Sequence, residues 1–246
     1  LVKGHHADLR ARIDTLTSGL LASDPPIVGL DPSVIVQPRR LHFTLGTLSL
    51  DSPAFSATAS SSQEATQLNT LEHASALLQA VQPRIIKLLA GRPLRIGLET
   101  IDMLQPERQR QGMAHVLVLC PDPKSDNGQR LRAVCDLVRE AFSREGLLVN
   151  AKQSLKVRPL HCTIINTRYR RPRPKKARVP FSYTALPAPS APAMDVHSAP
   201  QSQREKLLPI PTSFGSWQVD ELQLCQMGSW GPEGEYIADA RCSIVP

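Results

Sequence analysis

Two histidine–threonine pairs are the residues of this chain whose types and spacing could do chemistry. His42 and Thr44 stand two positions apart in the apolar segment RRLHFTLGTLSL, and His161 and Thr163 repeat that spacing in LHCTIINTRYRR. Side chains two positions apart in a strand point the same way, so each histidine would share a face with its threonine. One such pair means little, but two copies in similar apolar contexts predict two equivalent strands that line one cleft.

Displacement at phosphorus is a reaction that uses two imidazoles facing each other. The attacking and departing oxygens lie roughly in line on opposite sides of the phosphorus atom. A neutral imidazole can take a proton from water on one side, while an imidazolium gives a proton to the leaving oxygen on the other. Histidine suits both roles because its ordinary pKa is about 6.5, and threonine hydroxyls could donate to the non-bridging oxygens. The residues alone do not say which histidine is the acid.

The rest of the chain adds few candidates to this constellation. Arg40 would share the face of His42 in a strand and is a further candidate substrate contact. The other histidines receive no role. No carboxylate cluster and no His-x-x-x-His pairing has the spacing of metal ligands, so we expect no metal and no other cofactor.

Alternating helices and strands must position the two pairs. From apolar periodicity, capping residues and turn residues we expect helices at 5–22, 61–81 and 127–145, and strands at 40–50, 94–104, 114–120, 156–171, 215–227 and 235–245. Ser61 and Glu64 have the spacing of a capping box for the second helix, and Pro83 should kink or divide it. The strands at 94–104 and 114–120 should form an antiparallel pair, and the last two strands should be joined around Gly231 and Pro232.

A proline-, alanine- and serine-rich stretch at 172–206 should be mobile, with Phe181 and Tyr183 docked. The residues that follow it are too few for an independent core, so the stretch interrupts one domain and does not separate two. We therefore expect residues 1–246 to form a single bilobal domain.

The composition indicates a folded, soluble protein of a reducing compartment. Apolar residues make up 41% of the 246 residues, no run approaches the roughly 18 apolar residues that span a bilayer, and no signal-peptide pattern opens the chain. The 5 cysteines are scattered without a Cys-x-x-Cys pair, which argues against a disulfide framework and a zinc site. We expect an intracellular protein, nuclear, cytoplasmic or both, without a membrane partner.

Residues 168–178, RYRRPRPKKAR, are named the basic segment because they hold seven basic residues and no acidic one, as many as the net charge of +7. The run could be a solvated loop without a partner. It could instead contact an RNA backbone or an acidic protein, or be a nuclear-import signal. Tyr169 offers a ring for base stacking, so Tyr169 and Arg170 join Arg40 as further candidate substrate contacts.

These motifs resemble the two-histidine phosphoesterase superfamily, which includes RNA ligase-like cyclic phosphodiesterases. HFTLG at 42–46 and HCTII at 161–165 look like its paired His-x-Thr signatures. The flanking residues and the alternation from Trp217 to Ile244 are similar to the branch of the A-kinase anchoring protein central domain and activating signal cointegrator complex subunit one. The resemblance covers nearly the whole chain except 172–206. It implies a bilobal α+β fold in which two pseudo-twofold-related antiparallel sheets line a central cleft, with helices outside.

By this resemblance, His42 and His161 are the catalytic pair, and Thr44 and Thr163 hold the phosphate. The activity implied is metal-independent hydrolysis of 2′,3′-cyclic phosphates on nucleotides or RNA ends. Two alternatives use the same four residues: a nucleotide- or RNA-binding scaffold that has lost turnover, and RNA 3′-end trimming by transesterification, which would release cyclic phosphates. The chain departs from the family pattern in the inserted stretch and in beginning almost directly on its first helix, so it looks trimmed.

Overall fold

The computed structural model describes residues 6–51, 69–107, 110–149, 160–186 and 209–245. Its helices are α1 (Ala7–Leu21), α2 (Leu71–Leu89) and α3 (Asp126–Arg144), with short 3-10 turns η1 (Pro32–Val34), η2 (Pro38–Arg40) and η4 (Thr167–Tyr169). Its strands are β1 (Leu94–Gly97), β2 (Thr100–Pro106), β3 (Met113–Cys120), β4 (Cys162–Asn166), β5 (Phe181–Ser182), β6 (Ile210–Pro211), β7 (Ser216–Val219), β8 (Glu221–Trp230) and β9 (Tyr236–Ser243). Every strand pairing in the described part is antiparallel. This is the α+β fold class that the sequence predicted.

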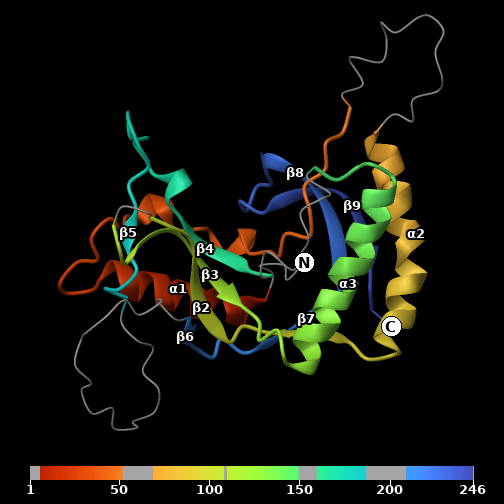
Figure 1. Ribbon diagram of the computed structural model, residues 1–246, viewed down its shortest axis with the longest axis horizontal. Coiled ribbons are helices and arrows are strands. Elements are labelled where there is room, and N and C mark those ends of the chain that lie inside the picture. Colours follow the sequence, from red (N-terminus) through yellow and green to blue (C-terminus); the bar gives the residue numbers. More distant parts are fainter. Residues whose placement is uncertain (1–5, 52–68, 108–109, 150–159, 187–208, 246) are drawn as a thin grey trace, which may run out of the picture.

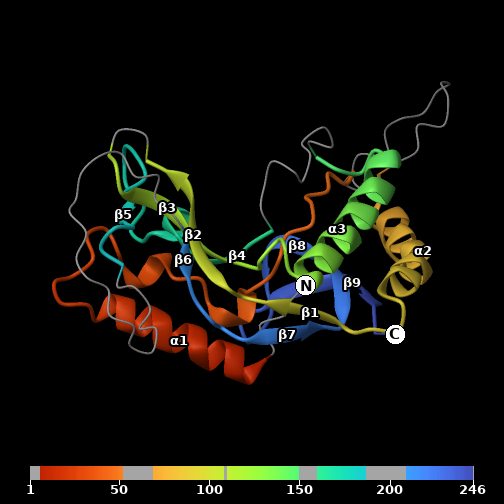
Figure 2. The ribbon, with the colours of Figure 1, turned by 60° about the horizontal axis from the view of Figure 1, so that its bottom comes forward.

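The elements gather in two groups (Figure 1). One group holds the sheet β4-β3-β2-β6, to which β5 adds on β3, with α1 running alongside (Figure 2). The other holds the pairs β1-β7 and β8-β9, which α2 and α3 cover side by side. One apolar cluster joins the two groups, with members as far apart as Leu9 on α1 and Leu78 on α2. No helix in the described ranges is both long and apolar enough to cross a bilayer.

The second helix begins later than predicted and continues past its proline. Thr70 is the N-cap of α2 and accepts a hydrogen bond from His73 N–H at 3.1 Å; the predicted capping box at 61–64 lies outside the described residues. α2 runs through Pro83 to Leu89, so of the two predicted effects of this proline, a kink or a division of the helix, division was wrong. Proline removes one backbone hydrogen bond, but the apolar stripe of α2 is buried on both sides of it, which keeps the helix continuous.

The predicted strand at 94–104 is two strands with different partners. β1 pairs with β7, whereas β2 pairs with β3 as expected. The change of partner occurs at Leu98 and Glu99, whose N–H groups donate to the carbonyls of Gly215 and Cys120. β1 and β2 therefore link the two groups of elements.

The segment at 40–50 is extended but is not the regular strand that the sequence predicted. Pro38–Arg40 forms the 3-10 turn η2, and beyond it only Phe43 and Leu48 form isolated bridges, to Cys162 and Leu148. Proline presets a turn at its own position, so Arg40 does not belong to the extended segment and does not share its alternation with His42. The predicted strand at 156–171 is also shorter: β4 spans Cys162–Asn166 and η4 follows, while 156–159 lie outside the described residues.

The first part of the inserted stretch packs against the sheet. Its described part, 172–186, contains β5, which pairs with β3, and buries Phe181 and Tyr183 at 0% and 3% exposure. The docking of these two rings agrees with the sequence prediction, whereas mobility of the stretch stays a prediction. The rings supply the apolar area that the flanking prolines and arginines lack, and this anchors the segment. Residues 187–206 lie outside the described part. The predicted strand at 215–227 is two strands: β7 pairs with β1, and β8 forms the predicted hairpin with β9.

Candidate active site

The two His-x-Thr motifs, residues 42–44 and 161–163, lie edge to edge. Their middle residues, Phe43 and Cys162, form an antiparallel bridge and are buried at 2% and 1% exposure. Neighbouring residues of an extended segment point to opposite faces. The flanking histidines and threonines therefore lie together on the face that points away from the core.

Continuing the bridge by one residue each way gives the pairing of the four side chains. His42 stands opposite Thr163, and Thr44 stands opposite His161. The two imidazoles are thus diagonal neighbours, which lie roughly 7–8 Å apart in a regular antiparallel pair. The charge of His161 also lowers the pKa of His42, as expected for neighbouring groups of the same sign. Thr44 is exposed and the other three residues are half-buried, so the group is open to solvent.

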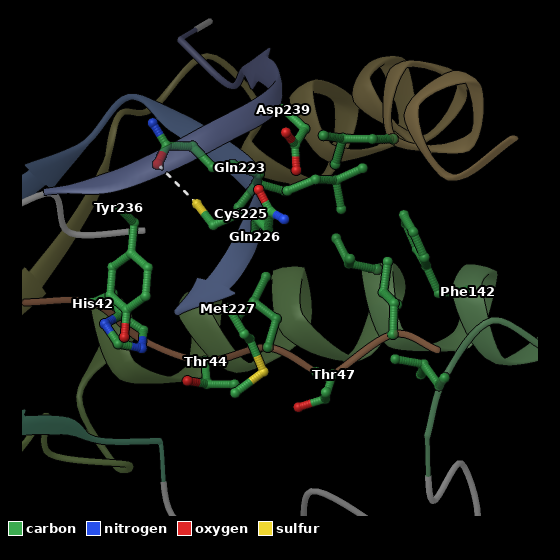
Figure 3. A pocket seen from close by; sticks show the side chains of 18 of the residues that line it. His42, Thr44, Thr47, Phe142, Gln223, Cys225, Gln226, Met227, Tyr236 and Asp239 are labelled. Atoms are coloured by element: carbon green, nitrogen blue, oxygen red, sulfur yellow. Dashed lines mark hydrogen bonds between the residues drawn. The ribbon is translucent and has the colours of Figure 1, made fainter. Parts of the chain in front are cut away.

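His42 is held from two sides. Its Nδ1 lies 2.7 Å from the backbone carbonyl oxygen of Arg40, and because a carbonyl can only accept, Nδ1 carries the hydrogen. Its ring meets the ring of Tyr236 edge to face, with centroids 5.0 Å apart and planes at 79° (Figure 3). In the neutral imidazole these contacts leave Nε2 with the free lone pair.

Burial lowers the pKa of His42 below its ordinary value, and the neighbouring His161 acts in the same direction. The hydrogen bond to the Arg40 carbonyl opposes this shift because it stabilises the protonated ring. The net result favours the neutral, proton-accepting form of His42 near neutral pH.

The β8–β9 hairpin closes over this histidine. Trp230 lies 4.7 Å from Tyr236 between ring centroids, and the guanidinium of Arg40 stacks 3.8 Å over the ring of Trp230. Arg40 Nε also donates to the carbonyl of Gly234 at 2.6 Å. Arg40 is therefore near His42, as the sequence suggested, but its side chain is engaged with the hairpin.

Tyr169 and the basic segment begin beside this hairpin. Tyr169, 41% exposed, shares a hydrogen bond with Tyr236, and this contact adds to burial in raising the pKa of Tyr236. Arg170 points elsewhere: its Nη2 donates to the carbonyl of Gly29 at 2.5 Å, and it lies near the carboxylate of Asp31. The structure thus brings Tyr169 to the His42 neighbourhood and directs Arg170 to the loop before η1.

The rest of the basic segment is exposed but held at both ends. Arg171 N–H donates to Ser33 Oγ at 2.8 Å, and the guanidinium of Arg178 donates to Gln105 and Asn166, each at 3.1 Å. Among the described residues, no basic side chain of this segment forms a salt bridge. A loop held at both ends therefore presents exposed positive charge next to the turn that carries Tyr169.

A cavity of about 810 Å³ opens beside His42 and Thr44 (Figure 3). It runs between the extended segment 42–50, α2, α3 and the hairpin, and most of its lining is apolar. Besides His42, Thr44 and Tyr236, its polar lining residues are Thr47, Arg139, Gln223, Gln226 and Asp239. His161 and Thr163 are not among its lining residues. Space for a bound molecule therefore extends from the first motif toward the hairpin.

Tyr236 and Trp230 were not predicted as site residues, because the alternation of apolar and polar residues around them indicated only a strand with one covered face. The available signal was two aromatic residues flanking a turn with Gly231, Pro232 and Gly234, in a chain with only 4% aromatic residues.

As to metals, the described residues contain no group of three or more histidine, cysteine, aspartate or glutamate side chains that could hold an ion.

Comparison with known proteins gives a sequence relative, solved structures and a family model. Activating signal cointegrator 1 complex subunit 1 of Mus musculus is 29% identical over 144 residues, which cover 58% of this chain and 34% of the relative's length. The crystal structure of TT0787 of Thermus thermophilus is 15% identical, with a TM-score of 0.47 over 97% of this chain and 92% of that one. A crystal structure described as a phosphoesterase is 17% identical, with a TM-score of 0.41 over 96% and 93%. The model of the AKAP7 2'5' RNA ligase-like domain matches residues 5–244, and the chain therefore belongs to that family.

Proposed function

We propose that this chain is a phosphodiesterase acting on nucleotide or RNA ends, with 2′,3′-cyclic phosphates as its substrates. The observation that carries this proposal is the bridge between Phe43 and Cys162, because it turns both His-x-Thr motifs to one open face. Membership of the RNA ligase-like family supports phosphodiesterase-type chemistry. The proposed active-site residues are His42, Thr44, His161 and Thr163.

The proposed reaction assigns different roles to the two histidines. Because burial favours neutral His42, its Nε2 takes a proton from water as the oxygen attacks phosphorus. His161, in its protonated form, gives a proton to the ribose oxygen as the bond from that oxygen to phosphorus breaks. Thr44 and Thr163 donate to the non-bridging oxygens, whose negative charge grows in the transition state. Exchange of protons with water then restores both histidines.

Replacing either histidine by alanine tests the assignment. We expect kcat to fall about 100- to 10,000-fold for His42→Ala and for His161→Ala, which is the usual value of general acid–base help. His73→Ala is the matched control, because His73 is a half-buried histidine paired with Glu145 on the helices. A small panel of cyclic nucleotides, assayed with and without chelator, reads out rate and product; full activity in both motif variants contradicts the proposal.

The same assay separates the two alternatives. A scaffold that has lost turnover binds the cyclic nucleotide without consuming it, and both alanine variants leave that result unchanged. A trimming enzyme releases cyclic phosphates from RNA 3′ ends, whereas the proposed enzyme consumes them. Product analysis by mass therefore distinguishes the three functions.

We further propose that the basic segment contacts the RNA backbone of a longer substrate. Its exposed cations start at η4, where Tyr169 meets Tyr236, so a strand that leaves the active site can follow them. Neutralised phosphates release counterions, so each lost contact lowers the log–log salt dependence of binding to a single strand by about 0.7.

Charge reversal tests the strand contact. Changing Arg171, Arg173 and Lys176 to Glu should weaken binding of an oligonucleotide and reduce its salt dependence, while turnover of a cyclic mononucleotide stays unchanged. Arg170 is left intact because it holds the Gly29 loop. The matched control reverses three exposed cations on the other group of elements, Arg84, Arg95 and Lys124. Equal effects of the two triple variants on oligonucleotide binding contradict the contact.

A further inference from the structure

The groups around His42 form a closed circuit of contacts. The ring of His42 packs on Tyr236 at 5.0 Å, Tyr236 packs on Trp230 at 4.7 Å, and Trp230 lies under the guanidinium of Arg40 at 3.8 Å. The backbone carbonyl of the same arginine accepts the hydrogen of His42 Nδ1 at 2.7 Å. The circuit therefore starts at the ring of His42 and ends at its Nδ1. A substrate contact, the role that the sequence predicted for Arg40, would not explain why Arg40 takes part in these contacts.

The turn between β8 and β9, residues 231–235, fastens this circuit to η2. Arg40 Nε donates to Gly234 O at 2.6 Å, and Arg39 pairs with Glu233. Gly234 has a φ of +81°, and a Cβ there would displace the exposed end of the Gln37 side chain and lie 3.6 Å from Arg40 Nη2. Because of its positive φ, a residue other than glycine at 234 would strain the turn whose carbonyl holds Arg40 Nε.

We infer that the β8–β9 turn is a positioning device for His42, and that Arg40, Trp230 and Gly234 are its positioning residues. By holding the side chain of Arg40, the turn keeps the Arg40 carbonyl on Nδ1 and leaves Nε2 as the nitrogen that meets the substrate. The catalytic consequence rests on the proposed function, whereas the orientation of the ring does not.

Such positioning is needed because either of the two ring nitrogens of imidazole can carry the hydrogen. A neutral ring has two tautomers, and the hydrogen bond at one nitrogen decides which nitrogen carries the lone pair. The proposed base works only with its lone pair on Nε2. A displacement of about 1 Å at a reacting group can cost roughly 100-fold in rate, so a loose carbonyl would reduce turnover without touching the phosphate.

The first test removes the ring under Arg40. In Trp230→Ala we expect a kcat about 10- to 100-fold lower, a KM within about twofold, and a mixed tautomer pattern for His42 in nitrogen-15 NMR of the side chain. Trp230→Phe keeps a ring beneath the guanidinium and should restore the Nδ1–H pattern. The control is Trp217→Ala, because Trp217 also carries an arginine over its ring, Arg12 at 5.9 Å, but lies beside His6 and not His42.

The second test uses two glycines of the same hairpin. Gly234 and Gly228 have nearly equal φ angles, +81° and +84°, so alanine strains the backbone similarly at both. Nothing lies within 4 Å of a Cβ at 228, whereas a Cβ at 234 meets Gln37 and Arg40. Gly234→Ala should alter the His42 tautomer pattern and lower kcat, and Gly228→Ala should share only the loss of stability.

The results separate this inference from the proposed function. Unchanged His42 tautomers in both Trp230→Ala and Gly234→Ala overturn the inference, even if activity falls, since the residues would then be only structural. If the wild-type chain lacks phosphodiesterase activity, the proposed function fails, while the NMR comparison of the variants with their controls still decides the positioning role.

Discussion

Replacing Tyr236 tests the link between the burial of His42 and its chemistry. Tyr236 packs on His42 and Trp230, and each aromatic pair contributes about 0.5–1.5 kcal/mol. Its hydroxyl adds a hydrogen bond to Tyr169, worth about 1 kcal/mol. Tyr236→Ala should therefore lower the free energy of unfolding by about 2–4 kcal/mol, whereas Tyr236→Phe should lose only about 1 kcal/mol.

The two variants should differ more sharply in their pH profiles. Burial is the main cause of the lowered pKa of His42, so opening the ring to water in Tyr236→Ala raises that pKa toward its ordinary value. The acid limb of kcat/KM reports the proposed base in the free enzyme, and it should move to higher pH. Tyr236→Phe keeps the aromatic ring over His42, so the acid limb of its kcat/KM profile should lie at the same pH as in the wild type.

The pH dependence of stability checks the same shift independently. The folded-state pKa of His42 lies below its unfolded value of about 6.5, so its contribution is fully present above that pH and is lost as the pH falls through the folded-state pKa. In Tyr236→Ala the free energy of unfolding should fall less steeply as the pH is lowered, as measured by urea unfolding at several pH values. An acid limb that stays in place or moves to lower pH in Tyr236→Ala refutes the reasoning.

Three further predictions concern the scaffold. Phe43→Ala should cost about 3–5 kcal/mol of unfolding free energy, the usual value for a buried phenylalanine, and should reduce activity with it because the ring anchors the first motif; urea unfolding and kcat measure both. Burial raises the pKa of Cys120, Cys135 and Cys162 to about 12, so a thiol reagent at pH 8 should leave these three unmodified in the native protein, as peptide mapping would show. Ser125→Ala should cost about 1 kcal/mol, since Ser125 Oγ accepts from Gly128 N–H at the start of α3; thermal unfolding measures the loss.

Local patterns in the sequence predicted the elements that bury a regular stripe. α1, α3 and β9 lie within a few residues of their expected bounds, because apolar spacing and turn residues act over short distances. The continuity of α2 through Pro83 and the change of strand partner at Leu98 depend on tertiary packing, which outweighs local propensity. Phe181 shows the same limit in part, since its docking was predicted from the sequence but the pairing of its strand β5 with β3 was not.

In the candidate site, too, the sequence predicted the local motifs but not the long-range contacts. The repeated His-x-Thr spacing could be read from the sequence because each motif is local, and the Phe43–Cys162 bridge then gives the two motifs a common face. The groups that hold His42 could not be read in this way, since Trp230 and Gly234 lie nearly 200 positions from Arg40 along the chain. Arg40 is the instructive case: the sequence selected it for a face it would share in a strand, whereas it lies in a turn and contacts the hairpin. A residue next to a candidate motif can therefore be selected correctly for the wrong reason. Only the long-range contacts distinguish a side chain placed to bind a substrate from one that holds a neighbouring side chain in position.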